Sequence, residues 1–416
     1  MRTWQKVIIG LVGVITLVVA GVTAYGLKVY YDANSTFDNI VEELDRDSTK
    51  RDTAVNIDAT DPFSILLLGL DTGAKGRTEQ GRSDTMIVVT VNPKKKQTTM
   101  LSLDRDIYTK IVGHEGGAMD KLNHAYAFGG VEMAMDSVEN LLDIPLDHYV
   151  TINMQGLSDL IDAVGGIKVH NQYHFELDGV ELQADTDYTL NGETGLAYSR
   201  FRKYDEATGM GDPDGDIGRQ KRQREVIEKI VNKVMSLDTV TNYQKILKAV
   251  EKNTKTDLTW DDMLDVANGY QNALKNVVPL QLQGEGQLYN SIYYQFLSAS
   301  SLLETQNTLK EQLGIATQEA LPVGDEYTSG YADYMFYNED TGTMEYYGNA
   351  AGYSGDSEES YSDYEEESSA DYSADYDSDY SEDYDSDYDT DYNEGYTEDQ
   401  YTDDQYDEGN QYSEAY

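Results

Sequence analysis

Three short apolar runs follow one another in the first quarter of the chain, and each one borders a charged side chain. The runs are Phe63–Leu70, Thr85–Val91 and Thr98–Leu103. Their length, and their separation by glycine-rich and Asn-Pro segments, predict buried strands. Asp71 follows the first strand, Asp84 opens the second, and Arg105 and Asp106 follow the third. A strand interior has no room for such groups, so their position at strand ends indicates chemistry.

Downstream of residue 106 the pattern alternates between helical and extended periodicity. Helices are predicted at residues 122–142, 155–164, 192–198 and 219–235, and strands at 149–153, 167–170, 188–190 and 277–282. Two or three further helices reach about Leu313, and Pro322 is predicted to close the folded part. Strands mixed with helices in this order predict an α/β fold in which helices cover both faces of a sheet.

The N-terminal segment carries the longest apolar run. Residues 7–27 contain no charged side chain, and this run is long enough to form a transmembrane helix. Arg2 and Lys6 precede it, so residues 1–6 are predicted to be cytoplasmic and the rest extracellular, with a single-pass membrane anchor. The alternative is a cleaved signal peptide with its site at residues 22–24. Residues 28–61 are predicted to form a stalk with a short helix around residues 40–44.

Charge is concentrated at the C-terminal end. Of the net charge of −46, residues 325–416 supply 31 Asp and Glu and no Lys or Arg. Tyrosines recur there every four residues from Tyr372 to Tyr396. Such a segment cannot bury a core, so 325–416 is predicted to be a disordered acidic tail. Loose divalent-cation binding and adhesion through tyrosine stacking remain alternatives. No basic surface suggests nucleic acid, and the lack of cysteine excludes disulfides.

A second group of candidate anion-binding side chains, four arginines and one glutamine, lies between residues 200 and 223. Its members are Arg200, Arg202, Arg219, Arg222 and Gln223, interrupted by a loop rich in Gly and Asp. Arginines near a helix N-terminus oppose the helix dipole, which makes sense if an anion such as phosphate binds there. The alternative is that these arginines form ion pairs with the acids of residues 205–216.

Two carboxylates and several arginines together have the composition of a magnesium–phosphate site. Mg²⁺ is usually held by one or two carboxylates and by phosphate oxygens of the substrate, while arginines neutralise the leaving phosphate. Asp71 and Asp84 are the candidate metal ligands. The alternative is that Asp71 is only a turn acid and Asp84 only a cap acid.

Five sequence blocks, in order, resemble the LytR–CpsA–Psr (LCP) family over residues 62–235. They are LLLGLDTG, GRSDTMIVVTVNP, SLDRDIYTKI, KLNHAYAFGG and SRFRK followed by DIGRQKRQ. The resemblance implies an α-β-α sandwich, with residues 62–320 as the catalytic domain, outside a Gram-positive-type membrane. It also implies transfer of a glycopolymer from a polyprenyl-pyrophosphate carrier to peptidoglycan. The family often has S-x-P-R-D where this chain has Asp104 in place of proline.

The resemblance also assigns roles to individual residues. It places Mg²⁺ (or Mn²⁺) on Asp71 and Asp84, and the substrate pyrophosphate on Arg105, Lys121, Arg200, Arg202, Arg219, Arg222 and Gln223. In the implied reaction a peptidoglycan hydroxyl attacks the phosphorus nearest the glycan, with Arg105 stabilising the leaving group and Asp106 as candidate base. The lipid needs an apolar tunnel, for which the helix face of residues 131–142 is a candidate; the alternative is that this face is ordinary core.

Three other interpretations are kept open. Asp71-Thr72-Gly73 matches the D-T-G signature of aspartic proteases, and a second copy occurs at residues 340–342, within the predicted tail. A non-enzymatic regulator or surface adhesin is the second. The third is a metal site at His170 and His174, which is disfavoured because that stretch does not have helical periodicity.

Overall fold

The computed structural model describes residues 23–347, except residues 45, 47–49, 52–54, 59, 72–80, 115–117, 206–207, 209, 237–238, 323–329 and 332. Most of the predicted transmembrane segment, and residues 348–416 of the predicted tail, lie outside the described residues. No helix in the described part of the chain has both the length and the apolar character needed to cross a membrane.

A six-stranded mixed sheet forms the centre of the domain, in the order β13-β6-β1-β2-β3-β14. Its strands are β1 (Phe63–Leu70), β2 (Ser83–Asn92), β3 (Gln97–Leu103), β6 (His148–Asn153), β13 (Thr254–Thr256) and β14 (Val277–Leu282). β2 runs antiparallel to both β1 and β3, while β6 is parallel to β1 and β14 is parallel to β3. The predicted strands at residues 63–70 and 277–282 are therefore confirmed at their bounds.

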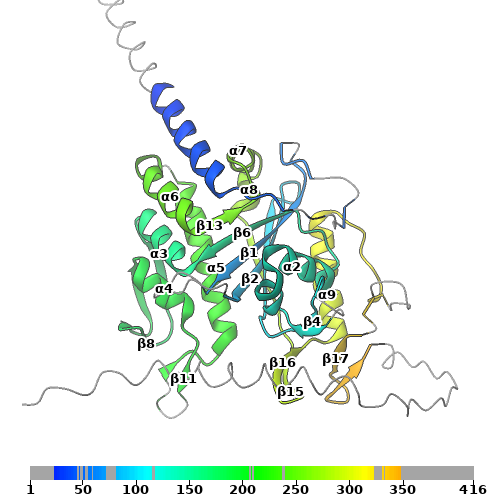
Figure 1. Ribbon diagram of the computed structural model, residues 1–416. Helices are drawn as coiled ribbons and strands as arrows, with labels where there is room; N and C mark the ends of the chain where they lie inside the picture. The colour runs from blue at the N-terminus through cyan, green and yellow to red at the C-terminus, as the bar shows by residue number, and fades with distance from the viewer. Residues whose placement is uncertain are drawn as a thin grey trace, which may run out of the picture. The chain divides into compact units, whose positions relative to one another are not determined.

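Helices cover both faces of this sheet, which confirms the predicted sandwich. On one side lie α2 (His124–Leu142) and α9 (Ala299–Leu313), and on the other α5 (Gly215–Val234), α7 (Trp260–Gly269) and α8 (Gln271–Leu274). Figure 1 shows α2 and α9 to the right of β1 and β2, and α5 to their left. Alternate residues explain the two cores: Leu66 and Leu68 of β1 face α2, whereas Phe63 packs against Tyr270.

A smaller apolar core lies beside the sheet. It is built by α3 (Met154–Ala163), α4 (Gly192–Arg200) and the hairpins of β7 (Ile167–Asn171) with β10 (Thr186–Leu190) and β8 (Phe175–Leu177) with β9 (Val180–Leu182). Phe175 stacks on Phe201 with a 4.1 Å centroid separation. An Asn191 capping box starts α4. Helix α6 (Thr239–Asn253) packs on α3.

Four further hairpins complete the described part of the domain. They are β4 (Tyr108–Lys110) with β5 (Met119–Lys121), β11 (Tyr204–Asp205) with β12 (Met210–Gly211), β15 (Glu285–Tyr289) with β16 (Ile292–Phe296), and β17 (Met335–Asn338) with β18 (Thr343–Tyr346). The hairpins of β4 and β15 lie near the end of β3. Ile107, which comes between β3 and β4, pairs with Gln295 of β16.

Two predictions at the ends of the domain are wrong. The short helix expected around residues 40–44 lies earlier, at residues 23–40, and its Ala33 and Ile40 are buried. Folding also continues past Pro322, because Tyr334 and Phe336 are buried in the main core and β17–β18 follows. The aromatic side chains of this segment can bury apolar area, whereas its acidic composition had suggested disorder.

Candidate functional site

The strand ends predicted to carry chemistry lie at one edge of the sheet. β1, β3, β6 and β14 share one direction and β2 runs opposite, so the ends of β1 and β3 meet the start of β2. Gly69 pairs with Thr85 and Leu70 with Ser83, which leaves Asp84 as the extra residue of a bulge. The backbone N–H of Asp71 donates a hydrogen bond to the backbone carbonyl of Arg82 at 3.3 Å. A bulge re-aims a side chain, and here it turns an acid toward the end of β3.

Arg105 lies at the centre of this edge. Its guanidinium bonds the Asp84 carboxylate at 2.8 Å and lies 3.7 Å from Asp106, which also pairs with Lys121 at 3.0 Å. Burial lowers the pKa of Arg105, but the carboxylates of Asp84, Asp106 and Asp216 together raise it by more. The net effect is a strongly held positive charge. Four residues predicted for the site are thus brought together: Asp84, Arg105, Asp106 and Lys121.

The second group of arginines reaches the same place through α5. Arg219 bonds Asp216 at 2.8 Å, and Arg202 lies 3.9 Å from the same carboxylate. Burial lowers the pKa of Arg219; Asp216 raises it, and the nearby charges of Arg105 and Arg202 lower it further. Arg105 and Arg219 are therefore electrostatic neighbours although they are far apart in sequence. We call Arg105, Lys121, Arg202 and Arg219 the basic clamp.

The clamp has an unused donor. Arg219 is 7% exposed, and its Nε has no hydrogen-bond partner within the described residues. Leaving a buried guanidinium N–H unpaired costs about 1–3 kcal/mol, and placing guanidinium groups near one another adds repulsion. Both costs are offset if an anion with several acceptor oxygens binds between the arginines. This arrangement fits a phosphate or pyrophosphate.

Two residues predicted for this site, Arg222 and Arg200, are placed differently, and a third, Gln223 on the same helix as Arg219, stays a prediction. Arg222 is buried, where it pairs with Asp212 and donates to the carbonyls of Tyr198 and Phe201. Arg200 bonds Asp178 at 2.5 Å in the turn between β8 and β9. Gln223 is half-buried on α5.

The helix start explains the difference. α5 begins at Gly215, one turn before the predicted start at Arg219, so its first turn holds Asp216 rather than arginine. The alternative, in which these arginines form ion pairs with acids of residues 205–216, is confirmed for Arg222, which pairs with Asp212, and for Arg219, which bonds Asp216 at 2.8 Å. Lys221 likewise bonds Asp214 at 2.6 Å.

The acids of the site fit a hard divalent cation. Asp84, Asp104, Asp106 and Asp216 surround the clamp, and a bound pyrophosphate would meet their negative charge unless a cation offset it. In the part of the chain that is described, no three His, Cys, Asp or Glu side chains are grouped to hold a metal by themselves. A pair of carboxylates, completed by phosphate oxygens, is the set that Mg²⁺ uses. Asp84 is the bulged residue of β2 and Asp71 directly follows β1, so both carboxylates belong to this edge of the sheet and fit this role.

Sequence reasoning missed one buried acid of the site. Asp104 is 4% exposed, and its carboxylate accepts a hydrogen bond from the Asp106 N–H at 2.9 Å. Burial, together with the charges of Asp216 and Asp106, raises the pKa of Asp104 to about 6, although the hydrogen bond from the Asp106 N–H opposes this shift. The only signal was its departure from the proline of the S-x-P-R-D pattern.

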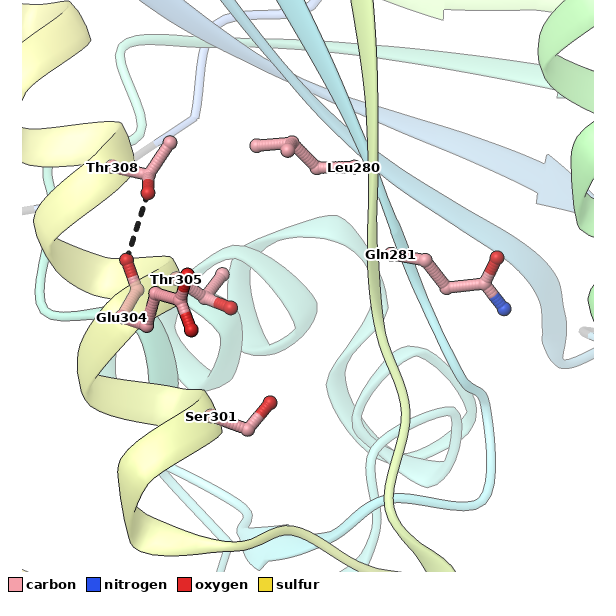
Figure 2. Close-up of a pocket in the computed structure, with 6 residues that line it drawn as sticks. All are labelled: Leu280, Gln281, Ser301, Glu304, Thr305 and Thr308. Carbon is pink, nitrogen blue, oxygen red and sulfur yellow. Dashed lines mark hydrogen bonds between the residues drawn. The ribbon is translucent and has the colours of Figure 1, made fainter.

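The face of α2 that was a candidate for a lipid tunnel is packed in the main core. Met135, Val138, Leu141 and Leu142 are fully buried against the sheet, so this face is ordinary core. A cavity of about 210 Å³ lies instead between β14 and α9. Figure 2 shows that Leu280 points toward α9, and that Ser301, Glu304, Thr305 and Thr308 make the facing wall. Polar side chains dominate this lining, so it is no apolar tunnel.

The remaining candidate motifs do not form sites in the described residues. His170 bonds Asp187 and His174 bonds Glu181, so the two rings have separate partners. The second D-T-G, residues 340–342, forms the exposed turn of the β17–β18 hairpin, rather than lying in a disordered tail as predicted. It has strands on both sides, but those strands form a separate two-stranded sheet from that of Asp71.

Comparison with known proteins identifies the family of this chain. The model of the LytR_cpsA_psr family matches residues 27–311. The chain belongs to the LytR–CpsA–Psr family. This confirms the resemblance seen in the five sequence blocks and extends it to include β13, β14 and most of α9. The D-T-G that begins at Asp71 lies within this match, so family membership accounts for it without a protease signature.

Individual members of the family can also be compared. The polyisoprenyl-teichoic acid–peptidoglycan teichoic acid transferase TagU of Enterococcus faecalis is 48% identical over 313 residues, 75% of this chain and 99% of that protein. Biofilm regulatory protein A of Streptococcus mutans is 42% identical over 334 residues, 77% and 80% of the two chains. The solved structure of YwtF (TagT) with bound octaprenyl pyrophosphate lipid is 32% identical, with a TM-score of 0.51, and covers 66% of this chain and 100% of that one.

Proposed function

We propose that this protein transfers a teichoic-acid-type glycopolymer from a polyisoprenyl-pyrophosphate carrier to peptidoglycan. The observation that carries the proposal is the convergence of Arg105 and Arg219, with a buried unpaired N–H, at the end of the sheet. Two relatives support the chemistry: TagU is named as such a transferase, and YwtF (TagT) holds a polyprenyl pyrophosphate.

The reaction is a phosphoryl transfer. A hydroxyl of the acceptor glycan attacks the phosphorus nearest the donor glycan, and a new P–O bond forms. The bond from that phosphorus to the bridging oxygen breaks, and polyprenyl phosphate leaves with the electron pair. Arg105 and Arg219 neutralise the charge that develops on the leaving phosphate. Asp106, held by Lys121 at 3.0 Å, is the proposed acceptor of the hydroxyl proton.

A divalent cation, Mg²⁺ or Mn²⁺, is proposed as the cofactor. Asp71 and Asp84 would hold it through carboxylate oxygens. Bound there, it would supply Lewis-acid neutralisation of the pyrophosphate oxygens. Asp84 also hydrogen-bonds Arg105, so it links the metal side of the site to the basic clamp.

The proposed location is the outer face of a cell membrane. The uncharged residues 7–27 support a single-pass anchor, and Arg2 and Lys6 support a cytoplasmic N-terminus. Both substrates of the proposed reaction, a membrane lipid and a wall polymer, would then be within reach of a domain tethered to the membrane.

The full-length chain in detergent tests this function. It is incubated with polyprenyl-pyrophosphate oligosaccharide and peptidoglycan, and transferred glycan is counted with Mg²⁺ present or chelated. Replacing Arg105 with Ala should lower the rate about 100-fold, because it removes a charge that acts on the leaving phosphate. Lys221→Ala is the matched control, since Lys221 is exposed and bonds Asp214. Absence of transfer by the wild type, or equal rates for Arg105→Ala and wild type, contradicts the proposal.

A further inference from the structure

The hairpin β15–β16 has one packed face and one open face. Its strands pair antiparallel, with Leu288 opposite Tyr293 and Gly286 opposite Gln295. Side chains alternate, so these four residues share one face. The opposite face carries Tyr289, Tyr294 and Phe296, whose rings pack around Tyr108 at 5.0–5.8 Å. On the open face Leu288 is 70% exposed and Tyr293 is 44% exposed.

The open face borders the basic clamp. The Gln295 N–H donates to the Asp106 carbonyl at 2.8 Å, which ties the hairpin to the turn that carries Arg105. Burial raises the pKa of Tyr293, and the charges of Asp104, Asp106 and Asp216 raise it further. Tyr293 is therefore close to the acids of the site, and its phenol stays protonated at neutral pH.

Tyr293 is held in one place by two neighbours. Gln295, which is 8% exposed, donates from Nε2 to the Tyr293 hydroxyl at 2.7 Å. Gly286 lies under the ring: a Cβ there would come within 2.2 Å of the Tyr293 oxygen. A glycine and a buried amide thus fix a half-exposed aromatic ring at the edge of the clamp. Neither is needed for the packed face of the hairpin.

We propose that the open face of β15–β16, centred on Tyr293, binds a pyranose ring of a glycan next to the pyrophosphate. An aromatic ring with a polar tip offers an apolar surface to the C–H face of a sugar and a hydrogen bond to its hydroxyls. The nearby carboxylates are further acceptors for sugar hydroxyls. An isoprenoid chain fits less well, because covering three carboxylates with hydrocarbon carries a large desolvation cost.

This inference rests on the proposed function, in which both the donor and the acceptor carry sugars. The shared chemistry is a pyranose, and binding measurements separate the two sources. The probes are polyprenyl pyrophosphate without sugar, the same lipid with a disaccharide, and a soluble peptidoglycan oligosaccharide. All are measured with the full-length chain in detergent micelles.

Tyr293→Ala is the main variant. We expect it to weaken binding of one sugar-bearing probe about tenfold, either the disaccharide lipid (first result) or the peptidoglycan oligosaccharide (second result). Binding of the sugar-free lipid should change less than about twofold. The first result identifies a donor subsite and the second an acceptor subsite. Tyr293→Phe keeps the aromatic ring, so it should lose less affinity for the sugar-bearing probe than Tyr293→Ala does. Gly286→Ala, which displaces the ring, should behave like Tyr293→Ala.

Two results overturn the inference. One is unchanged binding of both sugar-bearing probes by Tyr293→Ala. The other is an equal loss for the sugar-free lipid, which would mean that Tyr293 acts on the clamp or on folding. Tyr31→Ala is the control, because Tyr31 is an exposed tyrosine on the N-terminal helix. Failure of the wild type to bind the sugar-free lipid would instead count against the proposed function, so the two failures are distinguishable.

Discussion

Asp104 shows how a single buried acid can hold the turn that carries Arg105. The related pattern often has proline at this position, which fixes φ and so stiffens the turn. Here the Asp104 carboxylate accepts from the Asp106 N–H at 2.9 Å and holds the turn by a hydrogen bond instead. The same burial that secures this bond makes the charged form of Asp104 unfavourable.

The stability of the protein should therefore depend on pH through Asp104. Its folded pKa of about 6 lies above the unfolded value, so the folded state binds more protons. The contribution of Asp104 to the free energy of unfolding is fully present below about pH 4, and it is lost as the pH rises through 6. Asp104→Asn keeps the acceptor oxygen but cannot ionise. Relative to this variant, the wild type should lose about 3 kcal/mol of unfolding free energy between pH 4 and 7.

Urea unfolding at each pH, followed by the fluorescence of Trp260, measures this difference, because Trp260 is the first residue of α7 and reports on the folded domain. Only the difference between wild type and Asp104→Asn matters, because other groups titrate in both. Parallel stability curves across this pH range would show that Asp104 does not carry the effect. Asp104→Ala removes the hydrogen bond as well, and should be less stable than Asp104→Asn at every pH.

The sequence placed Arg219 and Arg222 near the start of one predicted helix, but it did not show which partner each arginine finds. Arg219 and Arg222 are separated by one turn and looked equivalent. Arg219 faces Arg105 across the clamp, whereas Arg222 is neutralised by Asp212 and two carbonyls. Which acid reaches which arginine depends on the path of the loop before α5. That path is a tertiary feature that periodicity does not contain.

Helix α5 is the element that joins the two cores of the molecule to the site. Arg219 of its second turn serves the clamp, Val226 and Ile230 pack in the smaller core, and Ile227 packs under the sheet. The loop before it is locked by Asp212, which bonds both Arg222 and the Asp214 N–H. Gly218 of α5 leaves the space that the Asp212 carboxylate occupies.

Gly218→Ala should therefore destabilise the protein through Asp212. The added Cβ would lie 1.7 Å from Asp212 Oδ2, so the carboxylate must leave and the buried Arg222 loses its charge partner. Breaking a buried ion pair costs about 3–5 kcal/mol, far more than the gain in helix propensity of about 1 kcal/mol. Urea unfolding measures the change, with Lys221→Ala as a neutral control on the same helix. An unchanged midpoint would show that Asp212 is not needed in this position.

At the level of elements, the sequence predicted the centre of the sheet well, because β2 and β3 are buried along most of their length and form apolar runs. The hairpin β15–β16 was missed, although Asn290 and Ser291 between two alternating runs are a hairpin signal. Its open face mixes Leu288, Tyr293 and Gln295, so polarity does not mark it as surface. The same mixture is what makes this face a candidate for binding sugars.

For the whole molecule, composition and folding give different C-terminal boundaries. Acidic residues dominate from residue 325, which predicted disorder from that point. Yet Tyr334 is fully buried and bonds Thr109 and Asn140, and Tyr331 bonds Gln306. Aromatic burial outweighs local charge here, because each such ring removes a large apolar area from water. Around Tyr331, Tyr334 and Phe336, therefore, the burial of aromatic side chains rather than the local net charge decides that the chain folds.

Two truncations separate these boundaries. A chain ending at residue 347 loses only the segment in which Tyr and Asp repeat, which has too few aliphatic residues to build a core, so its urea midpoint should match that of the full chain. A chain ending at residue 322 also loses Tyr331, Tyr334 and Phe336 from the main core. Removing even one buried aromatic ring costs about 3–5 kcal/mol, so this chain should lose at least that much stability. Tyr334→Ala in the full chain reproduces part of the loss without shortening it. Equal urea midpoints for the two truncated chains would place the end of the fold at Pro322. A lower midpoint for the chain that ends at residue 347 than for the full chain would give the repeat segment a structural role that its composition does not predict.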